Sequence, residues 1–166
     1  MIEAWFDGVT EPKNPGGHGA YGALVKVNGE TVLAEGGYVG HGSKISNNVC
    51  EYCGAMACLR RIKEIPNDFA ILRGDSLLVI NQLRGTFEVH GGLYVPYYRE
   101  AFKLYDPLRA RVTLEWIPRE RNSECDVLSK NVLLDRGIRF RIQPNPDAHL
   151  GAVEAESEAT ETRFGK

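Results

Sequence analysis

AYGALVKVNGETVLAEGGYV (residues 20–39) contains two segments rich in Tyr, Val and Leu, separated by Asn28-Gly29. An Asn-Gly pair between two such segments is a strong signal for a β-hairpin, because both positions of its tight turn need positive φ. Upstream, residues 1–7 (MIEAWFD) alternate apolar and polar side chains, as a half-buried strand does. The intervening EPKNPGGHG (11–19) is rich in turn-forming residues. Three consecutive strands are therefore predicted at 1–7, 20–27 and 31–39.

Beyond residue 40 the apolar spacing changes to that of helices. Residues 47–64 place Tyr52, Met56, Leu59 and Ile62 on one face, and Ile65-Pro66-Asn67 ends this predicted helix. The segments predicted after it are a strand at 69–72, helices at 75–83 and 96–108, a strand at 111–117, and a helix from 122 or 123 to 134. The order β-β-β-α-β-α-α-β-α predicts an α/β domain, with a mixed sheet and helices packed on its faces.

Composition is that of an ordinary globular domain, with 43% apolar and 25% charged residues in a chain of 166. No segment approaches the roughly 18 apolar residues of a membrane span, and the N-terminus lacks a signal-peptide pattern, so we expect a cytoplasmic protein without membrane association. Residues 143–166 carry five acids and few apolar side chains. We therefore predict a domain at 1–142 and an acidic, disordered tail at 143–166. The remaining body is close to neutral, so charge alone does not indicate a nucleic-acid partner.

Four cysteines are present: Cys50, Cys53, Cys58 and Cys125. The Cys50-x-x-Cys53 spacing leaves a zinc or redox site open, but a zinc site needs a second pair of ligands, which the sequence does not offer. All four fall in predicted helices among apolar residues, where cysteine acts as a small hydrophobe. We favour this packing role.

Four carboxylates lie near the ends of predicted elements: Asp7, Glu51, Asp75 and Asp126. Each has a structural alternative, respectively a turn, a capping box with Asn48, a helix cap and an interaction with a helix dipole. Asp7 and Asp75 each lie where a predicted strand ends, and ligands gather beyond the carboxyl ends of strands in α/β sheets. Glu51 continues an apolar helix face, which is a costly place for an unpaired carboxylate. Together the four acids predict a site for divalent cations with oxygen ligands, such as Mg²⁺.

Four stretches carry a family resemblance: WFDGVTEPKNPGGHGAYG (5–22), SNNVCEY (46–52), RGDSLLVINQL (73–83) and WIPRERNSECDVLSK (116–130). In this order they resemble the motifs of type 1 ribonuclease H, in the compact form that lacks a basic protrusion. The resemblance covers residues 2–134. It implies a ribonuclease H-like fold whose mixed five-stranded sheet has three antiparallel and two further parallel strands, with helices on both faces. It also implies an endonuclease that hydrolyses the RNA strand of RNA–DNA hybrids with two metal ions, leaving 5′-phosphate and 3′-hydroxyl ends.

The resemblance further implies a role for each site residue. Asp7 would contact both Mg²⁺ ions, which Mn²⁺ could replace; Asp126 would share the ion beside the nucleophile, and Glu51 and Asp75 the ion beside the leaving group. Asn47 and Asn48 are candidates for reading ribose 2′-hydroxyls, with helix capping as an alternative role. The other residues expected to bind substrate are Gly8, Asn14, Gly16, Ser46, Ser76, Arg119 and Asn122.

Three departures from the family pattern stand out. Leu77 occupies a position where the family often has Gln, and the loop PRERN (118–122) carries Arg119 but no His. Residues 84–98 contain only Arg84 as a cation. A non-catalytic module that binds hybrid or duplex RNA, and a same-fold exonuclease or resolvase, stay open as alternatives. The four acids favour an enzyme, and the Asn pair favours a hybrid substrate. We expect a monomer that acts on RNA–DNA hybrid.

Overall fold

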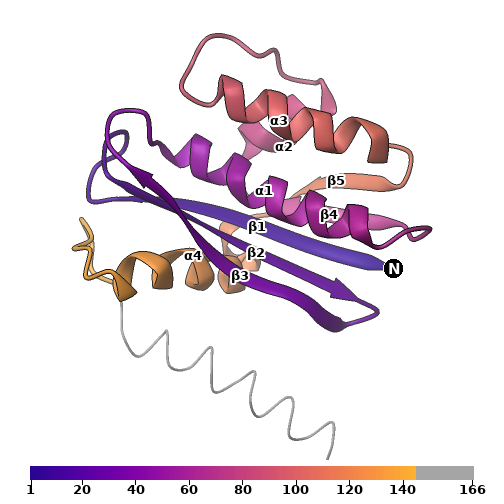
Figure 1. Ribbon diagram of the computed structural model, residues 1–166, viewed down its shortest axis with the longest axis horizontal. Helices are drawn as coiled ribbons and strands as arrows, with labels where there is room; N and C mark the ends of the chain where they lie inside the picture. The colour runs from indigo at the N-terminus through magenta and orange to yellow at the C-terminus, as the bar shows by residue number, and fades with distance from the viewer. Residues whose placement is uncertain (145–166) are drawn as a thin grey trace, which may run out of the picture.

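Five strands form one mixed sheet in the order β3-β2-β1-β4-β5 (Figure 1). The antiparallel part consists of β1 (Ile2–Glu11), β2 (His18–Val27) and β3 (Glu30–His41). On the other side of β1, β4 (Ala70–Gly74) and β5 (Val112–Trp116) add in parallel. The computed structural model describes residues 1–144, so nearly all of the predicted acidic tail lies outside the described residues. The predicted element order and mixed five-stranded sheet are confirmed.

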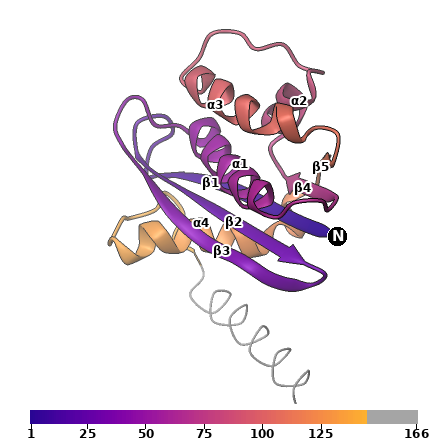
Figure 2. The ribbon, with the colours of Figure 1, turned by 45° about the vertical axis from the view of Figure 1, so that its right-hand side comes forward.

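Helices cover both faces of the sheet, as predicted. One face carries α1 (Asn47–Glu64), with α2 (Leu77–Arg84) and α3 (Val95–Tyr105) on the same side, and the other carries α4 (Ser123–Asp135) (Figures 1 and 2). Short 3-10 helices at Asp106–Leu108 and Arg119–Arg121 follow α3 and precede α4. The main core fills the space between α1 and the sheet, where Phe6, Tyr52 and Leu59 are fully buried. Within residues 1–144, no helix has the length and apolar character that a membrane crossing requires.

The first strand is longer than predicted, and this changes the position of Asp7. β2 begins at His18, which pairs with Glu11, so every residue of β1 from Ile2 to Glu11 has a partner on β2. Asp7 therefore lies inside β1, opposite Gly22, and the prediction that it lies at the end of a strand is wrong. On its other side, however, the parallel pairing with β4 stops at Phe6. Asp7 is thus the first residue of β1 beyond the parallel ladder, beside the carboxyl end of β4.

Most other predicted boundaries hold to within two or three residues. The helix at 47–64 is confirmed, and Asn28 and Gly29 have φ of 51° and 83°, as the predicted hairpin turn requires. The helix predicted to start at residue 75 starts at Leu77, because the cap is Ser76, whose hydroxyl accepts from the Val79 N–H at 3.2 Å. Asp75 is therefore not a helix cap.

Glycines allow the helices to lie unusually close to β1 and β2. A Cβ at Gly22 would lie 2.3 Å from the Cys125 carbonyl oxygen of α4, and one at Gly8 would lie 2.5 Å from the Glu51 nitrogen of α1. Both clashes are with backbone atoms, which cannot move without shifting the whole helix. The missing side chains therefore set the spacing between the sheet and the two helices that carry Glu51 and Asp126.

Replacing Gly22 with Ala tests this packing. Overpacking against backbone should lower the free energy of unfolding by about 1–3 kcal/mol or more, measured by urea denaturation. The control is Gly91→Ala, since a Cβ there meets nothing within 4 Å. Equal stabilities for the two variants would show that α4 is not held by this contact.

Candidate active site

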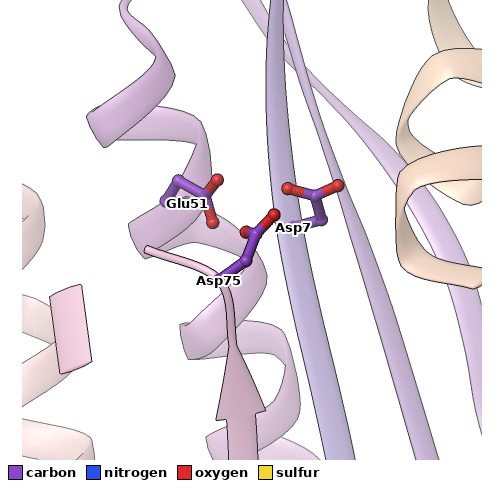
Figure 3. Close-up of side chains that lie close together, drawn as sticks. All are labelled: Asp7, Glu51 and Asp75. Atoms are coloured by element: carbon purple, nitrogen blue, oxygen red, sulfur yellow. The ribbon is translucent and has the colours of Figure 1, made fainter. Parts of the chain in front are cut away.

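Three carboxylates converge where β1, the start of α1 and the end of β4 meet. Asp7, Glu51 and Asp75 each offer an oxygen, and these oxygens lie within 4.8 Å of one another (Figure 3). Asp7 and Glu51 are only 6% and 8% exposed. Three acids so close and so shielded from water form a site of strongly negative character, which can hold a cation with oxygen ligands.

Neighbouring groups hold Asp7, on β1, and Asp75, in the turn after β4. The Gly8 N–H donates to Asp7 Oδ1 at 2.9 Å. The Trp116 indole N–H donates to the Asp75 main-chain oxygen at 3.1 Å, and Arg119 Nε lies 3.7 Å from Asp75 Oδ2. Trp116 stands at the end of β5, so the neighbouring strand holds the turn that carries Asp75.

Glu51 is held differently. It is not part of a capping box, because the cap of α1 is Ser46, whose hydroxyl accepts from the Val49 N–H at 3.3 Å. One of its carboxylate oxygens, Oε2, is buried and has no hydrogen-bond partner. An unpartnered buried oxygen is costly, and a cation is the kind of group that satisfies it.

Burial and mutual repulsion favour the protonated forms of these acids. Burial first, and then the charges of Asp75 and Asp126, raise the pKa of Asp7 to about 7. Burial also raises the pKa of Glu51 well above its usual range, with further contributions from Asp7 and Asp75. Burial raises the pKa of Asp75 less strongly, because the charge of Arg119 and a hydrogen bond from Asn122 oppose it.

The fourth predicted acid stands beside this group. Asp126 lies in the first turn of α4, and its Oδ2 accepts from Lys130 Nζ at 2.8 Å. Its charge acts on both Asp7 and Asp75, yet its oxygens are not among those that lie within 4.8 Å of one another. The structure therefore brings three of the four predicted acids together and leaves the fourth close by.

The turn between β1 and β2 is tied to the start of α1. Asn14 Oδ1 accepts from the Asn47 N–H at 3.0 Å, and the Gly16 N–H donates to the Ile45 oxygen at 3.0 Å. Gly16 has a φ of 110°, which favours glycine. Since Ser46 is the cap, the capping alternative for Asn47 and Asn48 is wrong. The Asn47 Oδ1 is buried and has no hydrogen-bond partner.

Other residues expected to bind substrate also stabilise the fold. Ser76 caps α2, and Gly8 leaves room for α1. Asn122 is only 2% exposed, and its amide donates to the Phe6 oxygen at 2.8 Å, just where the parallel partner of β1 ends. Asn122 therefore holds the strand residue next to Asp7. The indole of Trp116 was not predicted as a contributor, although its place at a strand end beside the PRERN loop was visible in the sequence.

The cysteines fit the packing role. All four are free, and Cys50, Cys58 and Cys125 are buried. Burial raises the pKa of the Cys50 thiol to about 12 and that of Cys53 to about 11. Both therefore stay protonated near neutral pH, as expected of buried cysteines that pack as small hydrophobes.

This sheet order, with acids on β1, α1 and the end of β4, defines a ribonuclease H-like domain. The chain belongs to the family described as reverse transcriptase-like, whose model matches residues 6–132.

Two relatives illustrate the similarity. Bifunctional protein Rv2228c of Mycobacterium tuberculosis is 35% identical over 122 residues, which are 72% of this chain and 32% of that protein. Ribonuclease HI of Halobacterium salinarum is 31% identical over 142 residues, which are 81% of this chain and 65% of that protein. The chain thus spans about a third of the length of the first relatives it matches.

Solved structures of ribonucleases H have the same fold. The RNase H1 of Halobacterium salinarum superposes with a TM-score of 0.66 at 28% identity, covering 81% of this chain and 98% of that one. The N-terminal RNase H domain of rv2228c gives 0.68 at 28% identity, covering 78% and 96%. An RNase H1 crystallised in complex with RNA/DNA hybrid gives 0.69 at 21% identity, covering 79% and 95%, and so shares the fold. The predicted ribonuclease H-like fold is confirmed.

The raised pKa values predict how stability depends on pH in excess chelator. Asp7 and Glu51 bind protons more tightly when folded than when unfolded, where their pKa values are about 4. Their contribution to stability is therefore complete below about pH 4 and is lost as the pH rises through the folded values, near 7 for Asp7.

Asp7→Asn has no proton to lose at this position. Its stability relative to the wild type should therefore rise between about pH 4 and pH 8, to a difference on the order of 4 kcal/mol. Urea unfolding across this range measures the effect, with the exposed-acid variant Asp135→Asn as control. A difference that stays constant with pH would contradict the raised pKa values.

Proposed function

We propose that this chain is an endonuclease that hydrolyses the RNA strand of RNA–DNA hybrids, leaving 5′-phosphate and 3′-hydroxyl ends. The observation that carries the proposal is the buried convergence of Asp7, Glu51 and Asp75. Three carboxylates so placed need either protons or a cation, and oxygen-ligated divalent cations are the usual partners of phosphodiester chemistry. The names of two relatives, a ribonuclease HI and an RNase H domain, support the reaction class.

The donor set fits two divalent cations, Mg²⁺ or Mn²⁺. Asp7, Glu51 and Asp75 would hold one, which the unpartnered Oε2 of Glu51 supports. Asp7 and Asp126 would hold the other, which the action of the Asp126 charge on Asp7 supports. When bound, such ions supply Lewis-acid stabilisation of the attacking and departing oxygens of a phosphodiester.

The chain's own contribution is to hold these acids in place. Asp7 lies on a strand paired on both sides up to Phe6, and the Gly8 N–H fixes its carboxylate. Asp75 is held through its main chain by Trp116 and through its carboxylate by Arg119 and Asn122. Acids fixed before the substrate arrives need little reorganisation during the reaction.

Groups for substrate recognition surround the acids. The hydroxyls of Ser46 and Ser76 each accept a main-chain N–H, which leaves their own O–H free to donate to a phosphate. Arg119, whose side chain is 87% exposed, can meet a phosphate beside Asp75. Asn47 and Asn48 begin α1 next to Glu51 and are suited to contact ribose 2′-hydroxyls, the groups that distinguish RNA from DNA. Asn14 and Gly16 bring the backbone of the neighbouring turn to the same place.

A gel assay on end-labelled substrates tests the proposal. With Mg²⁺, we expect cleavage of the RNA strand in a hybrid, and no cleavage of duplex RNA, duplex DNA or single strands. Asp7→Asn, Glu51→Gln and Asp75→Asn should each reduce the rate by at least about a hundredfold, because each removes a cation ligand. Asp135→Asn, an exposed acid at the end of α4, is the control and should stay active.

Three outcomes would overturn the proposal. Undiminished cleavage in excess chelator would exclude the metal site, and tight hybrid binding without cleavage would indicate a non-catalytic module. Preferential attack on single strands or on junctions would indicate an exonuclease or a resolvase.

The Asn pair gives a test of substrate choice. Asn47→Ala and Asn48→Ala should each lower kcat/KM on hybrid, with a loss of transition-state stabilisation of about 1–3 kcal/mol, since each leaves a polar substrate group unpaired. Thermal stability should change less, because the α1 cap is Ser46. Parallel losses of stability and activity would show that the pair serves the fold instead.

A further inference from the structure

The fourth acid of the site is engaged by its own helix. Asp126 Oδ2 lies 2.8 Å from the ammonium nitrogen of Lys130, one turn further along α4. The oxygens within 4.8 Å of one another belong to Asp7, Glu51 and Asp75, so Asp126 stands outside this group. Its charge nevertheless acts on both Asp7 and Asp75. Asp126 therefore stands beside the cluster, and a basic side chain already contacts one of its oxygens.

We propose that Lys130 is a positioning residue that competes with a divalent cation for Asp126 and thereby sets the affinity of the second cation position. The inference rests on the proposed function, since it concerns the same cation pair. To bind a cation through Oδ2, Asp126 must release the lysine. If it binds through its other oxygen instead, the nearby ammonium still repels the incoming divalent charge.

The geometry favours this competition. An acid four residues before a lysine is the favourable orientation for a helix ion pair, so α4 itself brings the two groups together. The side chains of Lys130 and Asp126 are 36% and 31% exposed, which leaves the pair partly open to water and ions. Pairs with this exposure are weak, so a divalent cation can displace the lysine.

The distribution of basic partners around the site supports the same view. Asp75 and Asp126 each face a basic side chain, Arg119 and Lys130. Among residues 1–144, no ion pair joins Asp7 or Glu51 to a basic side chain. Each cation position thus has one ligand that also contacts a basic side chain, Asp75 at the first and Asp126 at the second, and Lys130 lies closer to its acid than Arg119 does, at 2.8 Å against 3.7 Å.

Isothermal titration calorimetry with Mn²⁺, on the full chain without nucleic acid, tests the proposal. Lys130→Ala should lower the apparent Kd of the weaker Mn²⁺ position by about two- to fivefold, or bring a second equivalent into the measurable range. Lys130→Arg keeps the charge and should stay close to the wild type. The matched control is Lys103→Ala, which breaks a helix pair on α3, with Glu100 at 3.0 Å, and should leave the affinity unchanged.

A double-variant comparison separates competition from general charge. In an Asp126→Asn background, Lys130→Ala should have no effect on Mn²⁺ affinity, because the group competed for is gone. An effect of the same size in that background would overturn the inference, as would equal affinities for Lys130→Ala and Lys103→Ala. If the wild type binds no Mn²⁺ at all, the proposed function fails and the inference fails with it. Urea unfolding in chelator checks that each variant is folded.

Discussion

Repulsion among three carboxylates in a corner shielded from water is the constraint on which the site depends. Asp7, Glu51 and Asp75 come from a strand, a helix and a turn, and the fold brings their oxygens within 4.8 Å of one another. Burial and proximity raise the pKa of all three. The folded chain therefore needs protons or cations at this place, and the choice between them couples stability, pH and metal binding.

The rest of the fold can be understood as the frame for this corner. The parallel pairing of β1 with β4 ends at Phe6, which leaves Asp7 beside the open end of β4. Asn122 donates to the Phe6 oxygen at that point, and so joins the start of α4 to the sheet. Gly8 and Gly22 let both helices approach the strands closely enough for their acids to reach the same region. Small residues and one buried amide thus set the distances that the carboxylates need.

Much of this could be predicted from the sequence, because the signals are local. Asn28-Gly29, the apolar face of 47–64 and the order of elements gave the sheet and its helices correctly. The extent of β1 could not be predicted, since it depends on pairing with His18 across a turn. Nor could the sequence show that Ser46 and Ser76 would be the caps instead of the neighbouring acids and amides. The four-residue spacing of Asp126 and Lys130 predicts that they pair on one helix face. Whether Asp126 joins the cluster of the other three acids depends on tertiary distances, which the sequence does not show.

The most direct test of the account is crystallographic. Crystals of the chain soaked in Mn²⁺ should give an anomalous difference peak between the carboxylates of Asp7, Glu51 and Asp75, about 2.1 Å from the oxygens that bind it. A peak there would show that a cation offsets the repulsion. Well-ordered carboxylates with no peak at millimolar Mn²⁺ and neutral pH would contradict the account, because the acids would then rely on protons alone.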